Sequence, residues 1–184
     1  MEVNKLNNLP PKSSIEIKDG ILTKTLISDN PVWLEKFNTE KACYIAFKDN
    51  PINVTTPYLV GSNQNSLQLK FIEGKAICDE RYLENTLDKN LIKKIIADIR
   101  KINSYNSPIS NKTDYQEKIK KYSAKGFMEP TIATKLLSLI ENINADEFNH
   151  GDMLLKNIIL TPENNIAFID WEFAGLYIKG YDLA

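Results

Sequence analysis

Two short apolar runs, each next to a polar residue that a plain β-hairpin would not need, constrain this chain more than any other feature. Residues 158–160 (Ile-Ile-Leu) follow Asn157, and residues 166–169 (Ile-Ala-Phe-Ile) end at Asp170. The intervening Thr-Pro-Glu-Asn-Asn is typical of a turn. Antiparallel pairing of the two runs would bring Asn157 and Asp170 to the same end of one hairpin.

A second carboxylate joins this pair, because Asp152 lies five residues before Asn157 in the loop that leads into the first strand. Asn157 and Asp170 offer the hard oxygen ligands that Mg²⁺ prefers. Asp152 is then left to orient a hydroxyl nucleophile and accept its proton. The alternative is an ordinary hairpin with exposed polar residues at its ends. The spacing of all three residues favours a phosphoryl-transfer site.

The residues around these three positions resemble a known family. His150-Gly151-Asp152, Ile-Asp-Trp-Glu-Phe-Ala-Gly at 169–175 and Gly-Tyr-Asp-Leu-Ala at 180–184 are similar to the aminoglycoside phosphotransferase and choline kinase superfamily. The Trp-Glu-Phe-Ala-Gly segment at residues 171–175 is more similar to the choline/ethanolamine kinase branch. The resemblance implies an α+β, protein-kinase-like fold that uses ATP and Mg²⁺. In that fold, a small antiparallel N-terminal sheet with one helix precedes a mainly helical C-terminal lobe that carries the catalytic hairpin.

The N-terminal part of the chain predicts a strand hairpin followed by a helix. Residues 14–27 read as two strands joined by Asp19-Gly20, and Asn30-Pro31 is typical of a helix start. One helical face collects aromatic side chains, namely Trp33, Phe37, Tyr44 and Phe47.

Glu40 lies on this aromatic face, where a carboxylate is costly unless a cation meets it. Lys24, one strand earlier, is the natural partner. By resemblance, Lys24 binds the α- and β-phosphates of ATP and Glu40 aligns it. The alternatives are a Lys24 that faces water from an edge strand and a Glu40 at the margin of the aromatic face.

Residues 57–61 and 66–72 read as two further strands, after which the chain leaves the sheet at Phe71, Ile72 and Glu73. By resemblance, these three residues form the hinge that pairs with adenine. A strand end followed by glycine is common, so an ordinary turn remains the alternative. We expect a nucleotide-binding lobe over residues 1–74 and a helical catalytic lobe over residues 75–184.

The second lobe is predicted to be built from helices. A helical pattern begins at Leu83, with a broad apolar stripe over residues 91–102, and two more helices are predicted at residues 114–124 and 130–143. We expect these helices to form the core of the lobe beneath the sheet.

Two features depart from the family. No glycine precedes Gly20, so the loop that covers the ATP phosphates looks reduced to residues 10–14, where backbone amides of Ser13 and Ser14 could serve in part. The family usually continues through several helices beyond the position of Ala184, which suggests a truncated chain. A helical lobe left uncovered in this way would favour a homo-oligomer.

The net charge and the cysteine content indicate which partners and which cellular location to expect. With a net charge of −1 and a pI of about 5.9, the chain shows no footprint for nucleic acid or a membrane surface. Its two cysteines form no motif, which fits free thiols in the cytoplasm.

We therefore predict an ATP- and Mg²⁺-dependent phosphotransferase that acts on the hydroxyl of a small molecule, choline/ethanolamine-like or aminoglycoside-like. Asp152 would be catalytic, and His150, the single histidine, would support the catalytic loop. The alternative is a weak or inactive kinase remnant that binds nucleotide or acts as a scaffold. A protein kinase is less compatible, since Gly151 stands where the Arg that reads activation-loop phosphorylation would be.

Overall fold

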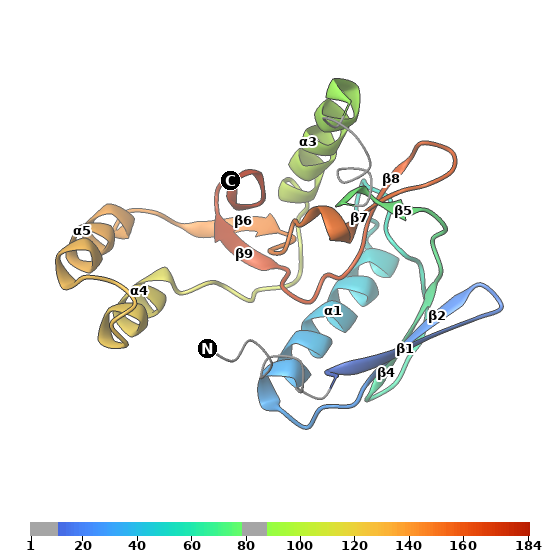
Figure 1. Cartoon of the computed structure of the whole chain (residues 1–184), viewed down its shortest axis with the longest axis horizontal. Coiled ribbons are helices and arrows are strands. Elements are labelled where there is room, and N and C mark those ends of the chain that lie inside the picture. Colours follow the sequence, from blue (N-terminus) through green and yellow to red (C-terminus); the bar gives the residue numbers. More distant parts are fainter. Residues whose placement is uncertain (1–10, 79–87) are drawn as a thin grey trace, which may run out of the picture.

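A computed structural model of the protein describes residues 11–78 and 88–184. The first unit is a four-stranded antiparallel sheet in the order β1-β2-β4-β3. Its strands are β1 (Ser13–Lys18), β2 (Ile21–Leu26), β3 (Leu59–Ser62) and β4 (Ser66–Lys70). Helix α1 (Pro31–Asp49) connects β2 to β3 and packs beside the sheet (Figure 1). The predicted N-terminal sheet with one helix is confirmed.

Local chemistry explains both predicted boundaries in this unit. Asp19 and Gly20 have φ angles of 50° and 73°, the left-handed pair that a tight two-residue hairpin turn needs. The Asn30 side chain accepts a hydrogen bond from the Val32 amide and caps α1, with Pro31 in its first turn.

The predicted hairpin at residues 158–169 is confirmed. Strands β7 (Ile158–Leu160) and β8 (Ile166–Phe168) pair antiparallel, and β5 (Lys75–Ala76) pairs with the other edge of β7. The Ile169 amide donates to the Asn157 carbonyl oxygen over 3.0 Å, which extends the pairing past the strand ends. Asn157, at the end of the short helix η2 (Leu155–Asn157), therefore lies beside Ile169, which directly precedes Asp170.

The remaining elements form the second half of the molecule (Figure 1). Its helices are α3 (Lys89–Asn103), α4 (Tyr115–Ala124) and α5 (Pro130–Ile140), followed by the paired strands β6 (Ala145–Asn149) and β9 (Gly175–Ile178) and the short helix η3 (Tyr181–Leu183). The predicted start of the helical pattern at Leu83 lies outside the described residues. The division into lobes at Gly74 stays a prediction.

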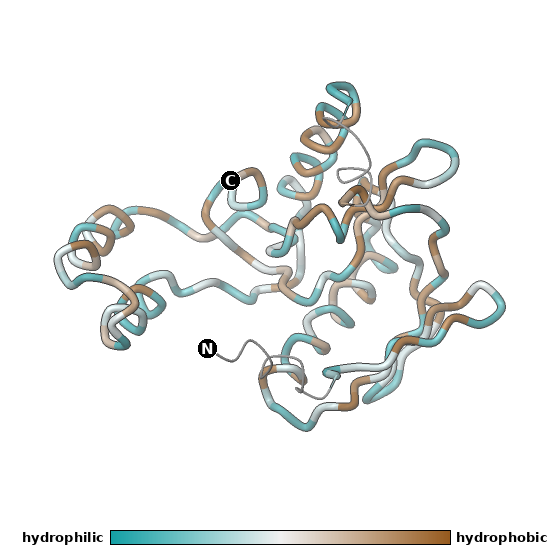
Figure 2. The backbone as a smooth tube through the Cα atoms, viewed as in Figure 1, coloured by the Kyte–Doolittle hydropathy of each residue, from teal (hydrophilic) through white to brown (hydrophobic). Residues whose placement is uncertain are grey.

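The three helices of the second half differ in burial, which the sequence did not predict. Helix α3 buries Ile95, Ile99 and Ile102, as expected of a core element. Helices α4 and α5 pack on each other at the end of the arm formed by β6 and β9, away from the N-terminal sheet (Figure 1). Of their residues only Ala133 is buried, and Leu139 on α5 is exposed. Hydrophobic residues recur along α5 in Figure 2. The expectation that α4 and α5 form the core was wrong, because an apolar face shows that a helix needs cover but not what supplies it.

The core runs from the inner face of α1 through α3 to the β7–β8 hairpin, with Phe37, Ile99, Phe148 and Phe168 among its buried residues. No helix in the described part of the chain combines the length and apolar character that a membrane span requires.

Candidate active site

Six of the predicted site residues line one cavity of about 320 Å³ between the N-terminal sheet and the β7–β8 hairpin. Lys24 and Glu40 enter it from β2 and α1, Asn157 and Asp170 from the hairpin, and Phe71 from the end of β4. Ile72 also lines it, whereas Glu73 is exposed and the lining passes from Ile72 to Gly74. The assignment of Glu73 to adenine binding stays a prediction.

Lys24 is the centre of the charged end of this cavity. Its Nζ lies 2.5 Å from Glu40 Oε2, 2.9 Å from Asp170 Oδ1 and 3.7 Å from Glu172 Oε2. The predicted Lys24–Glu40 ion pair is therefore confirmed, and Lys24 is 8% exposed rather than facing water.

The surroundings keep these groups charged at neutral pH. Burial alone would lower the pKa of Lys24, but the carboxylates of Glu40 and Asp170 outweigh it and raise that pKa. Burial raises the pKa of Glu40 to about 6, against the opposing charge of Lys24. Burial would also raise the pKa of Asp170, yet Lys24 holds it below its ordinary value. A lysine and two carboxylates thus face the cavity as ions.

Asp152 and Asn157 are joined by hydrogen bonds across the loop before β7. The Asn157 amide nitrogen donates to the Asp152 backbone oxygen over 2.9 Å and to its Oδ2 over 3.0 Å. Both bonds use the nitrogen, so they leave the amide oxygen of Asn157 as a potential metal ligand. Lys156 Nζ lies 4.0 Å from Asp152 Oδ2 in an exposed position.

These donors suit Mg²⁺. The amide oxygen of Asn157 and the ionised carboxylate of Asp170 are hard oxygen ligands that line the same cavity. Asp170 has a φ angle of 64°, a left-handed conformation that is uncommon outside glycine and is often found at functional sites.

The loop that contains Asp152 is braced by Asp182, the position that by resemblance braces this loop or caps the next helix. Asp182 accepts hydrogen bonds from the backbone amides of His150 (2.6 Å) and Gly151 (2.9 Å). Gly151 has a φ angle of 80°, and a Cβ there would lie 2.2 Å from the Phe173 carbonyl oxygen. Only glycine fits, which explains why Gly151 stands where a protein kinase has Arg.

His150 is fully buried and supports the loop through both ring nitrogens. Nε2 lies 2.9 Å from the Ile169 carbonyl oxygen, and Nδ1 lies 3.3 Å from the Asp152 amide. Nδ1 can accept from that amide only in the neutral ring, with Nε2–H donating to Ile169.

We expect this arrangement to make stability depend on pH. Burial lowers the pKa of His150 below its ordinary value of 6.5, although the Ile169 carbonyl and Asp182 oppose the shift. The stabilisation is therefore complete above about pH 6.5 and is lost as the pH falls towards the folded-state pKa. Urea unfolding of the wild type and His150→Gln measures it. The difference in unfolding free energy should be largest at about pH 7.5 and shrink by about pH 5; a constant difference would show that His150 does not titrate in this way.

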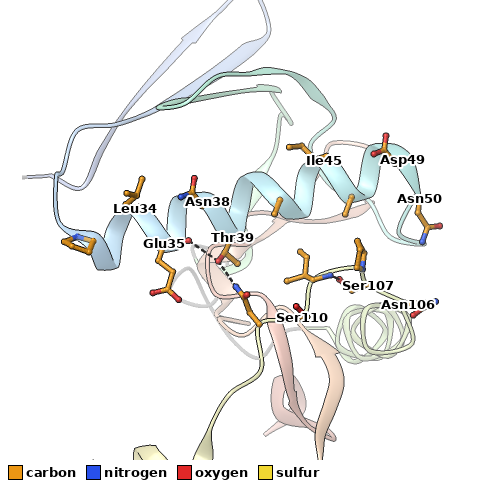
Figure 3. Close-up of a pocket in the computed structure, with 16 residues that line it drawn as sticks. Leu34, Glu35, Asn38, Thr39, Ile45, Asp49, Asn50, Asn106, Ser107 and Ser110 are labelled. Atoms are coloured by element: carbon orange, nitrogen blue, oxygen red, sulfur yellow. Dashed lines mark hydrogen bonds between the residues drawn. The ribbon is translucent and has the colours of Figure 1, made fainter.

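A larger cavity, of about 1130 Å³, lies on the opposite face of α1, against residues 106–111 (Figure 3). There the Asn111 amide donates to the Thr39 hydroxyl over 3.1 Å. None of the predicted site residues line it. The smaller cavity is therefore the candidate active site.

One ion pair at the site was not predicted from the sequence. Lys12 Nζ lies 2.6 Å from Glu172 Oε1 and joins the segment before β1 to the residue two positions after Asp170. The sequence offered only a weak signal, a lysine in the segment where the family has its glycine-containing loop. Glu172 is 5% exposed and is paired with both Lys12 and Lys24.

Comparisons with known proteins show which family the chain matches. The profile of the family described as choline/ethanolamine kinase matches residues 53–184. The curated Protein LicA homolog of Mycoplasma capricolum is 25% identical over 136 residues, covering 70% of this chain and 52% of that protein. The chain thus spans about half the length of this curated relative.

Solved structures share the fold. ADP-bound aminoglycoside phosphotransferase APH(2'')-Ib matches with a TM-score of 0.74 and 14% identity, over 95% of this chain and 67% of that one. Choline kinase LicA from Streptococcus pneumoniae matches with a TM-score of 0.62 and 18% identity, over 100% and 67%. The predicted α+β, kinase-like fold is confirmed.

Proposed function

Because the chain belongs to the choline/ethanolamine kinase family, we propose that it transfers the γ-phosphoryl group of ATP to the hydroxyl of a small molecule in the presence of Mg²⁺. The observation that carries the proposal is the convergence of Lys24, Asn157 and Asp170 on one cavity, with Asp152 hydrogen-bonded to Asn157. The proposed acceptor is choline/ethanolamine-like or aminoglycoside-like, and the proposed location is the cytoplasm.

Each group has a distinct role in this proposal. Lys24, held by Glu40, binds the α- and β-phosphates. Asn157 and Asp170 hold Mg²⁺, which when bound neutralises charge on the phosphates. Phe71 and Ile72 contact adenine at the other end of the cavity. Asp152 orients the acceptor hydroxyl and accepts its proton, so catalysis rests on positioning and charge stabilisation.

A specific observation favours the alternative of a nucleotide-binding remnant with little or no turnover. Residues 11–19 contain no glycine, and the glycine turn at Gly20 lies at the adenine end of the cavity, where the Phe71 amide donates to the Gly20 carbonyl oxygen over 2.8 Å. A turnover assay separates the two functions, since both require nucleotide binding.

Thermal unfolding with ATP and Mg²⁺, separately and together, tests the binding site. At about 100 times Kd a ligand stabilises the fold by about 2.7 kcal/mol, which raises Tm by roughly 5–10 °C in a chain of this size. We expect the full shift only when both are present. Asp170→Asn should remove the Mg²⁺-dependent part, because it deletes the charge while Asn tolerates the left-handed backbone.

Glu163→Ala is the matched control for this variant, since Glu163 is exposed in the turn at the far end of the same hairpin. It should behave as the wild type does. A full Mg²⁺-dependent shift in Asp170→Asn would contradict the assignment of the metal ligand.

A further inference from the structure

Among the described residues, a lysine lies at the end of the cavity to which the proposed function assigns the phosphates. Lys12 lines the cavity together with Lys24, Asn157 and Asp170. Its carbonyl oxygen accepts hydrogen bonds from the amides of Ile27 (3.1 Å) and Ser28 (3.2 Å), directly after β2. The backbone of Lys12 is thereby fixed at the end of the sheet opposite the glycine turn.

The Lys12 side chain reaches from this anchor towards the metal side of the site. Its Nζ lies 2.6 Å from Glu172 Oε1 and 5.3 Å from the centre of the Trp33 ring. The side chain is 37% exposed, whereas that of Glu172 is 6% exposed. The lysine is therefore the accessible member of the pair and can exchange its partner at little desolvation cost.

The pair belongs to a cluster in which carboxylates outnumber lysines. Glu40, Asp170 and Glu172 place carboxylate oxygens within 4.8 Å of one another. Lys24 contacts all three and Lys12 contacts Glu172. Three anions thus face two cations. A bound triphosphate would add negative charge at the end of the cavity where Lys24 lies. This added charge favours the presence of a second cation, Lys12, beside Lys24.

We propose that Lys12 binds the phosphates of the nucleotide and that Glu172 holds its ammonium group in position when the nucleotide is absent. This inference rests on the proposed function. It gives the segment before β1 a phosphate-binding role that uses a side-chain charge where the family has a glycine-containing loop.

The test is to measure the affinity for ATP, ADP and adenosine by calorimetry, with Mg²⁺ present throughout, in the wild type and in Lys12→Met. Hydrogen bonds to charged groups are worth about 1.5–3 kcal/mol, so ATP should bind roughly 10- to 100-fold more weakly to the variant. Adenosine affinity should not change, because adenosine has no phosphate.

Two further variants separate charge from structure. Lys12→Arg keeps the charge and should retain ATP affinity within a few fold. Lys18→Met is the matched control, since Lys18 is exposed at the other end of β1 and does not line the cavity; it should bind ATP as the wild type does.

Each other outcome has a defined meaning. Equal weakening of ATP and adenosine in Lys12→Met would assign Lys12 a structural role, and unchanged ATP affinity would show that it does not contact phosphate; either result overturns the inference while the proposed function stands. A wild type that binds neither ATP nor adenosine would overturn the proposed function, and the inference with it.

Discussion

Replacing Asp152 with Asn should lower the turnover number by roughly 10²- to 10⁴-fold, the range expected when a positioned general base is lost. Binding of ATP with Mg²⁺ should persist, because Asn157 keeps its second hydrogen bond, to the backbone oxygen of residue 152. The substitution preserves the size of the side chain and removes its negative charge and its ability to accept a proton. A loss of turnover with intact nucleotide binding would therefore place Asp152 at the acceptor hydroxyl.

The measurement is ADP release with a panel of acceptors that contains choline, ethanolamine and aminoglycosides. Asp146→Asn, at an exposed position on β6, is the control and should not affect turnover. Retained turnover in Asp152→Asn would exclude Asp152 as the base. Wild-type protein that binds ATP with Mg²⁺ but turns over no member of the panel would favour the remnant function.

The candidate site could be predicted from the sequence where local patterns decide geometry. The two apolar runs fixed the register of β7 and β8, and that register brings Asn157 beside Ile169. The Lys24–Glu40 pair followed from electrostatics, because a carboxylate on a buried aromatic face requires a cation. The contact between Lys24 and Asp170, by contrast, was not predicted.

Other parts of the structure could not be predicted because they depend on contacts between distant segments. Lys12 and Glu172 are 160 positions apart in the sequence and meet only after the sheet and the hairpin have come together. Helices α4 and α5 have apolar faces that the sequence assigned to a core, yet they lie away from it. A helical period identifies the buried face of a helix only when the partner of that face is known.

The position of Asp170 also depends on its neighbour Trp171, which joins the site to the core. Trp171 is fully buried, and its ring contacts Phe47 with a centroid distance of 4.8 Å, His150 with 4.5 Å and Phe148 with 6.2 Å. Its indole Nε1 donates to the Phe168 carbonyl oxygen over 3.2 Å. One side chain thus connects α1, the catalytic loop and the hairpin.

Trp171→Ala should therefore destabilise the fold by about 3–5 kcal/mol, through lost apolar burial and the cavity left among these aromatic rings. Urea unfolding, followed by circular dichroism, measures the loss of stability.

Trp33→Ala is the matched control, because Trp33 is the other tryptophan and is only half-buried on α1. This control should lower the free energy of unfolding clearly less. Trp171→Phe, which retains an aromatic ring, should also cost less, and it provides a folded variant if Trp171→Ala does not fold. Equal losses in Trp171→Ala and Trp33→Ala would mean that Trp171 does not join the core to the end of the hairpin that carries Asp170.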